Sequence, residues 1–331
     1  MLRHPDGRCD EVYPVIDEIP RLLVGAYRAE LVVRRREWFA EGDARRALAA
    51  RWQPDRASGG ADAVVSGFDY EWALFRGTGT PDARAVFELY FDLIARDQFA
   101  GRTVLDAGCG AGRWAREVAA QGARVVAVDL GASVELARVN AAGSDRVGCV
   151  QGDLRDLPLR DASVDWAYSL GVLHHLDRPE AGLDGVVRSV RPGGRVLLYL
   201  YYAFDDRGLL FRSLFRLVDA VRRVTSRSPR IVALLVSVVV GLGVYWPLAR
   251  ASRLLARLGL GRLADALPLS FYRDRSLRTM LNDSLDRFGT RLERRYTRQA
   301  MARLMTNAGL GEVAFSTQAP FWHAIGSRST G

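Results

Sequence analysis

Lysine is absent from this chain of 331 residues, and cysteine, methionine and histidine are scarce. All 47 basic residues are arginine, so the formal net charge of +9 reflects a biased composition more than a phosphate-binding surface. The three cysteines, Cys9, Cys109 and Cys149, exclude a disulfide scaffold and indicate a reducing compartment. They have neither paired spacing nor neighbouring histidines, and we therefore expect no metal site.

An apolar leader is also lacking, because Met1–Asp10 is polar. This segment does not resemble a secretory signal and predicts a cytoplasmic protein. Hydrophobic residues make up 49% of the chain and charged residues 26%, as in ordinary globular proteins. This composition argues against a disordered chain and against a membrane protein with several spans.

The charge is unevenly distributed along the chain. Residues 1–200 contain 26 arginines against 29 acidic residues, whereas residues 201–331 contain 21 arginines against 9 acidic residues. The positive second part could attract nucleic acid, anionic lipid or an acidic substrate. Solvated arginine-rich helix faces would explain the same numbers.

From Thr103 onward, short runs rich in valine, alanine and leucine alternate with helical stretches. The runs are TVLDAGC, ARVVAVDL, RVGCVQGD, SVDWAYSLG and GRVLLYLYY. This alternation predicts an α/β fold with a doubly wound, mostly parallel sheet that is covered on both faces. A helix over about 298–308 and two strand-like runs, EVAFSTQ and FWHAIG, are expected to complete the sheet with an antiparallel strand.

The pattern divides the chain into four parts. Residues 1–67 form an N-terminal extension with a helical stretch and a linker, and residues 68–202 form the core. Residues 203–296 are a helical, basic insert that we expect to cover the substrate, and residues 297–331 return to the core as a helix and a strand pair.

The strongest chemical signal is a glycine-rich turn, DAGCGAG, over residues 106–112, between a strand and a helix. Its spacing is G-x-G-x-G rather than the G-x-G-x-x-G of dinucleotide folds, and Asp106 precedes the glycines. An acid there disfavours a pyrophosphate and favours a cationic ligand such as S-adenosylmethionine. Asp129 and Asp153 end the next two strands, at the sheet edge where ligands of such folds bind.

Five motifs in order, VLDAGCGAGRW, VVAVD, QGDLRDLPL, SVDWAYSLGVLHHLDRPE and RPGGRVLLY, resemble class I S-adenosylmethionine-dependent methyltransferases. The nearest branch is that of the quinone-biosynthesis methyltransferases. The resemblance covers about residues 100–202, together with the closing helix and strand pair. It implies a Rossmann-like fold, S-adenosylmethionine as the cofactor, and methyl transfer as the reaction.

The resemblance also implies which strand ends hold the cofactor. The implied positions are Asp106, Gly108 and Gly110 at the methionine end, Asp129 at the ribose, Asp153 and Leu154 at the adenine, and Ser169 and Leu170 beneath the sulfonium. Upstream, residues 68–75 (FDYEWALF), with Trp72, resemble an aromatic segment that folds over the cofactor. The alternative is that these rings pack the first helix onto the sheet.

Histidines are candidates for proton transfer, which is needed only if the acceptor must lose a proton. His174 and His175 follow the fourth strand, where the methyl group should point, and either could act as the base or orient the acceptor. The alternative is that they cap a helix or bond the backbone. His323, in the last strand, is expected to be a packed residue.

Residues 231–249 (IVALLVSVVVGLGVYWPLA) form the longest uncharged run, between Arg230 and Arg250. At helical rise the run would span roughly 28 Å, close to a bilayer core. Gly241, Gly243 and Pro247 weaken a single straight helix. The run is either a buried helix of the insert or a contact with an anionic membrane through residues 203–262.

Both interpretations of the insert favour a bulky apolar acceptor, such as a quinone precursor, polyketide, terpenoid or lipid. Tyr199 and Tyr201 should point to one face of the sheet and line this acceptor site, with Tyr202 on the other face. The alternatives are an RNA methyltransferase, suggested only by the basic half, and a non-catalytic S-adenosylmethionine-binding protein. The sequence does not specify an oligomeric state.

Overall fold

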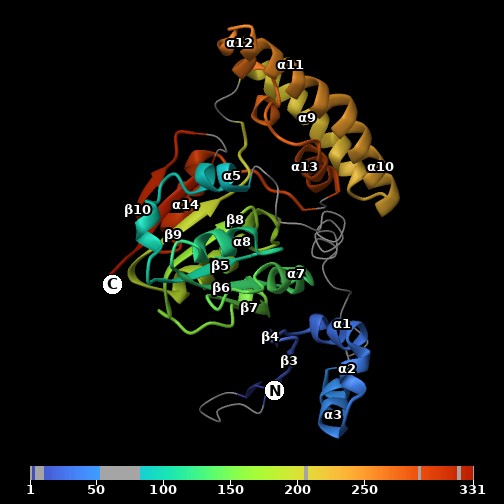
Figure 1. The fold of residues 1–331 in the computed structure, drawn as a ribbon, viewed down its shortest axis with the longest axis vertical. Helices are drawn as coiled ribbons and strands as arrows, with labels where there is room; N and C mark the ends of the chain where they lie inside the picture. Colours follow the sequence, from blue (N-terminus) through green and yellow to red (C-terminus); the bar gives the residue numbers. More distant parts are fainter. Residues whose placement is uncertain are drawn as a thin grey trace.

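The structure is a computed structural model that describes residues 2–3, 11–52, 83–204, 208–289, 292–318 and 322–330. Trp72 and the rest of the segment 68–75 lie outside these residues. The chain forms a nine-stranded sheet with helices on both faces, in the order β10-β11-β9-β8-β5-β6-β7-β4-β3 (Figure 1). The predicted fold, a doubly wound and mostly parallel sheet, is confirmed.

The five strands predicted from apolar runs all form, and they pair in parallel in the spatial order β7-β6-β5-β8-β9. The closing strands are antiparallel, with β11 between β9 and β10. These seven strands are β5 (Thr103–Ala107), β6 (Arg124–Asp129), β7 (Val147–Gly152), β8 (Val164–Leu170), β9 (Val190–Tyr199), β10 (Leu310–Phe315) and β11 (His323–Arg328).

Alternate residues of each strand enter two hydrophobic cores, one on each face of the sheet. In β5, Val104 belongs to the first core and Leu105 to the second, and both are fully buried. Side chains of α5 (Ala83–Tyr90), α6 (Arg113–Ala119) and α7 (Ser133–Asn140) fill the first core. Side chains of α8 (Pro179–Ser189) and α14 (Arg298–Asn307) fill the second.

The N-terminal extension contributes strands to the same sheet. β4 (Ile19–Leu22) pairs in parallel with β7, and β3 (Val15–Ile16) pairs antiparallel with β4. Arg21 of β4 is fully buried and donates to Glu135 at 3.1 Å and to Gln151 at 2.9 Å. The extension is therefore attached to the core through backbone pairing and a buried ion pair.

The helical stretch predicted over residues 26–52 is confirmed as three short helices. They are α1 (Ala26–Arg34), α2 (Arg36–Ala40) and α3 (Asp43–Arg51), and they lie at one end of the molecule (Figure 1). Two further short strands, β1 (Leu2–Arg3) and β2 (Val12–Tyr13), pair with each other.

The insert is helical, as predicted, and lies at the end of the molecule opposite α1–α3 (Figure 1). Its helices are α9 (Leu209–Thr225), α10 (Arg230–Val240), α11 (Trp246–Arg257), α12 (Gly261–Ala266) and α13 (Leu277–Gly289). A π-helical turn, η4 (Gly241–Tyr245), joins α10 to α11 without interruption, and a 3-10 turn, η5 (Ser270–Tyr272), precedes α13. The glycines therefore widen the helix instead of ending it.

The apolar run does not form a buried helix. Ile231–Arg257 is long and apolar enough to cross a membrane by length and composition, and only 22% of its most apolar window is buried. Of the two interpretations of this run, the structure does not agree with a helix enclosed by the insert, and membrane contact stays a prediction.

Candidate cofactor and acceptor site

The glycine-rich turn needs glycine at Gly108 for two reasons, the conformation of the backbone and the close approach of a neighbouring side chain. The amides of Gly108 and Cys109 donate to the carbonyl of Val128, at 2.8 and 3.0 Å, which folds the turn over the end of β6. Gly108 has φ +85°, and a Cβ on it would lie 2.4 Å from a methyl group of Val172. Only glycine satisfies both the left-handed backbone and this close approach.

Asp129 holds the same turn from the neighbouring strand. Its Oδ2 accepts from the amide of Gly110 at 2.8 Å, and its Oδ1 accepts from the amide of Gly131 at 2.8 Å and the hydroxyl of Ser133 at 3.2 Å. The carboxylate is therefore fixed in position at the carboxyl end of β6. Its role at the ribose remains a prediction.

Asp106 is a strongly perturbed acid at this edge. Burial raises its pKa to about 7, with a smaller contribution from the negative charge of Asp129, while the nearby Tyr168 hydroxyl opposes the shift. Within hydrogen-bond geometry, Oδ2 of Asp106 has no partner among the residues that the structure describes. A buried carboxylate oxygen without a hydrogen-bond partner fits a cationic group bound beside it, as the ammonium of S-adenosylmethionine would be.

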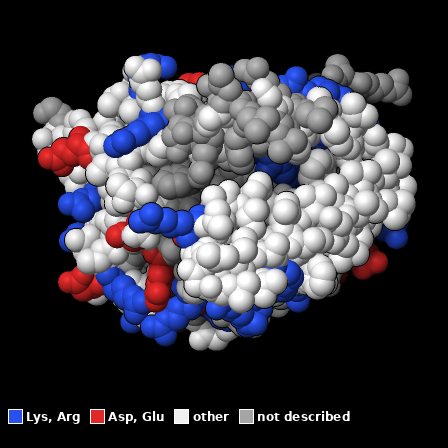
Figure 2. Space-filling view, turned by 90° about the horizontal axis from the view of Figure 1, so that it is seen from above, with Lys and Arg blue, Asp and Glu red and all other residues white. Residues whose placement is uncertain are grey.

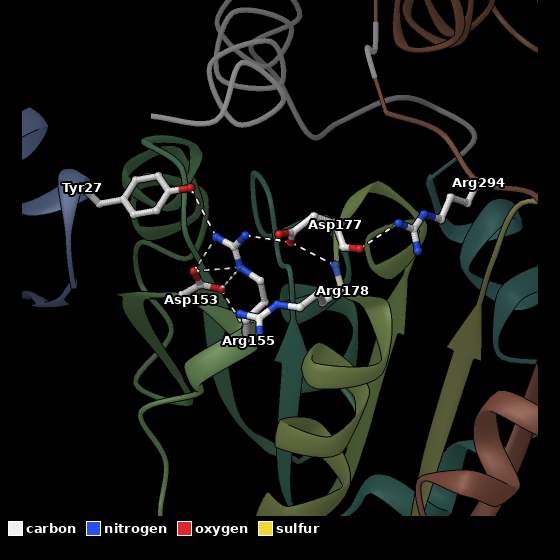
Figure 3. Close-up of polar contacts among 6 residues, drawn as sticks. All are labelled: Tyr27, Asp153, Arg155, Asp177, Arg178 and Arg294. Carbon is white, nitrogen blue, oxygen red and sulfur yellow. Dashed lines mark hydrogen bonds and ion pairs between the residues drawn. The ribbon is translucent and has the colours of Figure 1, made fainter. Parts of the chain in front are cut away.

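Asp153 is occupied by a partner that the sequence did not predict. The guanidinium of Arg155 donates to both carboxylate oxygens of Asp153, with Nη2–Oδ2 at 2.7 Å, and its Nη1 donates to Asp177 at 2.8 Å (Figure 3). These bonds lower the pKa of the Asp177 carboxyl and raise that of Arg155. Asp153 also accepts from the Arg155 amide and so begins the turn that follows β7.

Arg155 connects three parts of the chain. Its Nη2 approaches the Tyr27 hydroxyl of α1 at 3.4 Å, and the carbonyl of Asp177 accepts from Arg294, at the end of the insert, at 2.7 Å (Figure 3). The N-terminal helices, the core and the insert therefore meet beside the predicted adenine end. The signal in the sequence was an arginine two residues after a strand-end acid.

The other predicted cofactor residues are more deeply placed. Ser169 is fully buried, and its hydroxyl donates to the carbonyl of Ala107 at 2.9 Å, so that its observed contact joins β8 to β5. Leu170 is partly buried against the first core, and Leu154 belongs to the second core. Their contacts with a cofactor remain predictions.

The two histidines lie side by side after β8, with ring centroids 4.0 Å apart. Nδ1 of His175 lies 2.7 Å from the carbonyl of Leu292, so this nitrogen carries the proton and Nε2 is the acceptor. His174 is fully buried, its ring lies 3.9 Å from that of Tyr201, and burial holds its pKa well below the ordinary value. His174 is therefore a neutral imidazole at pH 7.

An aromatic group lies next to the histidines. Tyr199 contacts Tyr90 at 4.9 Å between centroids and Tyr201 at 6.0 Å, whereas Tyr202 packs on Trp322. The predicted division of the three tyrosines between two faces is confirmed. Tyr90 was missed because it lies more than a hundred residues away in the sequence.

Arg295 joins the insert to this aromatic group. Its guanidinium lies over the rings of Tyr201, Phe204 and Phe215, at 4.6 to 5.4 Å, and its Nη2 lies 2.5 Å from a carboxylate oxygen of Glu293. The Glu293 side chain is almost completely buried. The insert therefore places an ion pair against the ring of Tyr201, which also contacts the ring of His174.

The remaining candidates have structural surroundings. His323 is fully buried and bonds Asp92 at 2.7 Å, so it is the packed residue expected. Cys109 and Cys149 are buried, and burial raises the pKa of both thiols. Within the described ranges, no group of three or more metal-binding side chains is present.

Known proteins resemble the core of the chain. Residues 105–198 match the family model described as "Methyltransferase domain". The demethylmenaquinone methyltransferase of Clavibacter sepedonicus is 39% identical over 100 residues, which cover 30% of this chain and 41% of that protein. The malonyl-[acyl-carrier protein] O-methyltransferase of Pectobacterium atrosepticum is 37% identical over 94 residues, which cover 28% of this chain and 36% of that protein.

The chain thus spans about two fifths of the length of these curated relatives. Among solved structures, the magnesium protoporphyrin IX methyltransferase of Synechocystis PCC 6803 aligns with a TM-score of 0.46 and 16% identity, over 80% of this chain and 96% of that one. The ordered motifs, the sheet and the family match together identify residues 105–198 as the core of a class I S-adenosylmethionine-dependent methyltransferase domain.

Proposed function

We propose that this protein transfers a methyl group from S-adenosylmethionine to an oxygen, carbon or nitrogen atom of a bulky apolar small molecule or lipid-like acceptor. One observation carries the proposal. Asp106 is a buried acid without a hydrogen-bonding partner at Oδ2 among the described residues, and it stands with Asp129 at the edge where ligands of doubly wound sheets bind.

The cofactor would supply an activated methyl group. Asp106 would hold its ammonium group, the Gly108–Gly110 turn would let the backbone approach it, and Asp129 would accept from the ribose hydroxyls. Asp129 is already oriented by Gly110 and Gly131, so binding would require little reorganisation at that acid. Asp153, held by Arg155, would define the adenine end.

His175 is the better candidate for a base. The carbonyl of Leu292 fixes the proton on Nδ1, which leaves Nε2 as the atom that could accept a proton from the acceptor. His174 would act as a positioning residue, because its neutral ring packs between His175 and Tyr201. Single-turnover kinetics distinguish the roles: His175→Gln should slow methyl transfer far more than His174→Gln does.

The aromatic surroundings support a planar or lipid-like acceptor. Tyr90, Tyr199 and Tyr201 present rings beside the histidines, and Arg295 ties the insert to them. Such rings bind apolar surfaces and leave polar edges to orient an acceptor. The name of one relative, a demethylmenaquinone methyltransferase, agrees with this class. We place the enzyme in the cytoplasm, with peripheral contact to an anionic membrane through residues 203–262.

Calorimetry with S-adenosylmethionine tests the cofactor part of the proposal. Asp129→Asn should weaken binding by roughly tenfold or more, because one strong charge-assisted acceptor is lost. Asp145→Asn, which changes an exposed acid outside the site, should bind as the parent does. Equal affinity in all three proteins would contradict the assignment of the site.

A comparison of metabolites from cells with and without the gene tests the acceptor. A pair of apolar compounds that differ by one methylene mass is the expected result. Methylation found only in RNA would contradict a small-molecule acceptor and favour an RNA methyltransferase. Cofactor binding without any methylated product would favour the non-catalytic alternative.

A further inference from the structure

Helix α10, the turn η4 and helix α11 form a continuous helix. Its buried face carries small residues and its exposed face carries large aliphatic residues, whereas a water-soluble helix buries its large aliphatic residues. The face turned toward the rest of the insert carries mainly small residues, and all of them are buried. They are Ala233, Ser237, Gly241, Tyr245, Ala249 and Ser252. Their spacing of three and four places them in one line along the helix.

This inner line packs closely against α13. The hydroxyl of Ser284 donates to the carbonyl of Ser237 at 2.8 Å, and Ser237 donates to the carbonyl of Ala233 at 2.7 Å. A Cβ on Gly241 would lie 2.7 Å from a methyl group of Leu281. Small residues allow the backbones of the two helices to approach closely, and the serine hydroxyls bond backbone carbonyls across and along the contact.

The opposite face carries large aliphatic residues that are exposed. Leu235 is 58% exposed and Val239 is 67% exposed, and both lie on the stripe Ile231, Leu235, Val239, Leu242 and Trp246. Leu254 and Leu258 continue the exposed apolar surface on α11. A contiguous apolar surface of this kind marks an interaction site in a soluble domain.

Positive charge is concentrated beside this surface, where Arg223 and Arg253 are paired with Asp219 and Asp274 of neighbouring segments. Residues 220–264 contain eight arginines and no aspartate or glutamate. Arg223, Arg227, Arg257 and Arg262 are exposed. Viewed from above, the molecule shows a broad uncharged ridge with arginines along its borders (Figure 2). A second copy would bring two arginine-rich segments together, so the charge is unfavourable for self-association through this face.

We propose that the outer face of α10–η4–α11 docks on the surface of an anionic lipid bilayer, with the helix lying in the plane of the interface. The aliphatic stripe enters the acyl boundary, and the arginines contact acidic headgroups. Arg250, Arg253 and Arg257 in the last third of the helix, and its packing on α13 along the inner face, suit a helix that lies on the membrane and does not cross it.

Docking does not depend on methyl transfer, but it would bring a lipid-dissolved acceptor to the catalytic domain. α13 packs on the inner face of the docking helix, and the chain that follows it carries Glu293 and Arg295 to Tyr201. The interface and the acceptor site are therefore linked through one helix.

Co-sedimentation of the full-length protein with vesicles tests this proposal. Vesicles of phosphatidylcholine with phosphatidylglycerol should bind the protein, and vesicles of phosphatidylcholine alone should bind it several-fold more weakly. Binding to the anionic vesicles should fall as salt is added, because headgroup contacts are screened. Failure of the parent protein to bind anionic vesicles at low salt would overturn the proposal.

Two matched variants locate the contact. Val239→Glu should weaken partitioning by roughly tenfold, since it places a charge where the exposed valine would enter the acyl boundary. Val139→Glu, at a valine of α7 that is also 67% exposed, should bind vesicles as the parent does. Calorimetric binding of S-adenosylmethionine and thermal unfolding confirm that both variants are folded, and their outcome tests the methyltransferase domain separately.

Equal vesicle binding by Val239→Glu and the parent would show that another surface makes the contact. If Val239→Glu instead abolished self-association measured by light scattering, the face would be a protein interface and the proposal would be wrong. Binding of the parent to RNA in preference to anionic vesicles, lost on arginine substitution but not in Val239→Glu, would also overturn it.

Discussion

The sheet core and the insert both contain apolar runs, but the core buries its large apolar side chains and the insert exposes them. In β5, Val104 and Leu105 point into two cores and are fully buried. In α10, Ala233 and Ser237 are buried while Leu235 and Val239 are exposed. An apolar run therefore shows that residues avoid water, but only the packing shows whether protein or lipid is on the other side.

The two regions also differ in how they use charge. The core gathers acids at the carboxyl ends of its strands, where Asp106, Asp129 and Asp153 stand in sequence order on neighbouring strands. The insert carries arginine over residues 220–264 without any acid. The first arrangement suits a cationic cofactor, and the second suits an anionic surface.

Gly108→Ala should produce the largest loss of stability and cofactor affinity, because its side chain would collide with Val172. The backbone at φ +85° is strained for alanine, and the added Cβ would lie 2.4 Å from Val172. Unfolding in urea should show a loss of about 2–5 kcal/mol, and cofactor binding should disappear. Gly143→Ala has the same φ and nothing within 4 Å of its Cβ, so it should lose only about 1 kcal/mol.

Asp106→Asn should stabilise the protein at pH 8 and abolish cofactor binding. The pKa of Asp106 is about 7 in the folded chain against an ordinary 3.8. Stability therefore falls as pH rises between these values and levels off above 7. Removing the charge should restore on the order of 2 kcal/mol at pH 8 and much less at pH 5. If Asp106→Asn and the parent were equally stable at both pH values, ionisation of the Asp106 carboxyl would not destabilise the fold, and the prediction would be wrong.

Much of the core could be predicted because its signals are local. Strands with continuous apolar residues, a glycine turn and acids at strand ends predict the parallel sheet and the candidate cofactor edge without knowledge of tertiary contacts. Arg155 could not be assigned in this way, because its partners Tyr27 and Asp177 come from distant parts of the sequence. The same holds for Arg295 on Tyr201.

The insert was predicted as helical but not in its orientation. Nothing in the composition of residues 231–249 distinguishes a helix buried by protein from one that exposes its aliphatic side. The line of small residues at spacings of three and four was not recognised in the sequence, and the contacts of α13 with Gly241 and Ser237 identify it as the packed face.

Arg155→Gln should have an intermediate effect, because the residue joins the core to both neighbouring regions. Its bonds to Asp153 and Asp177 are charge-assisted and partly exposed. We expect a loss of about 1–2 kcal/mol in unfolding and a weaker cofactor affinity. Arg102→Gln, at an exposed arginine of the core, should change neither quantity. Increased proteolysis within residues 26–52 in Arg155→Gln alone would show that Tyr27 is held through this arginine.

Leu235→Ala should have the smallest effect in water, although the same substitution in the sheet is severe. Leu235 is 58% exposed and makes no core contact in the described chain, so its truncation should change the free energy of unfolding by less than about 0.5 kcal/mol. Leu105→Ala, at a fully buried leucine, should cost about 2–5 kcal/mol. Urea unfolding of both variants measures the difference directly. If Leu235→Ala cost as much as Leu105→Ala, the leucine would be packed against protein, and the contrast between core and insert would fail. If the two differ as expected, the exposed leucine contributes nothing to folding in water, as expected of a side chain whose contact lies outside the folded chain.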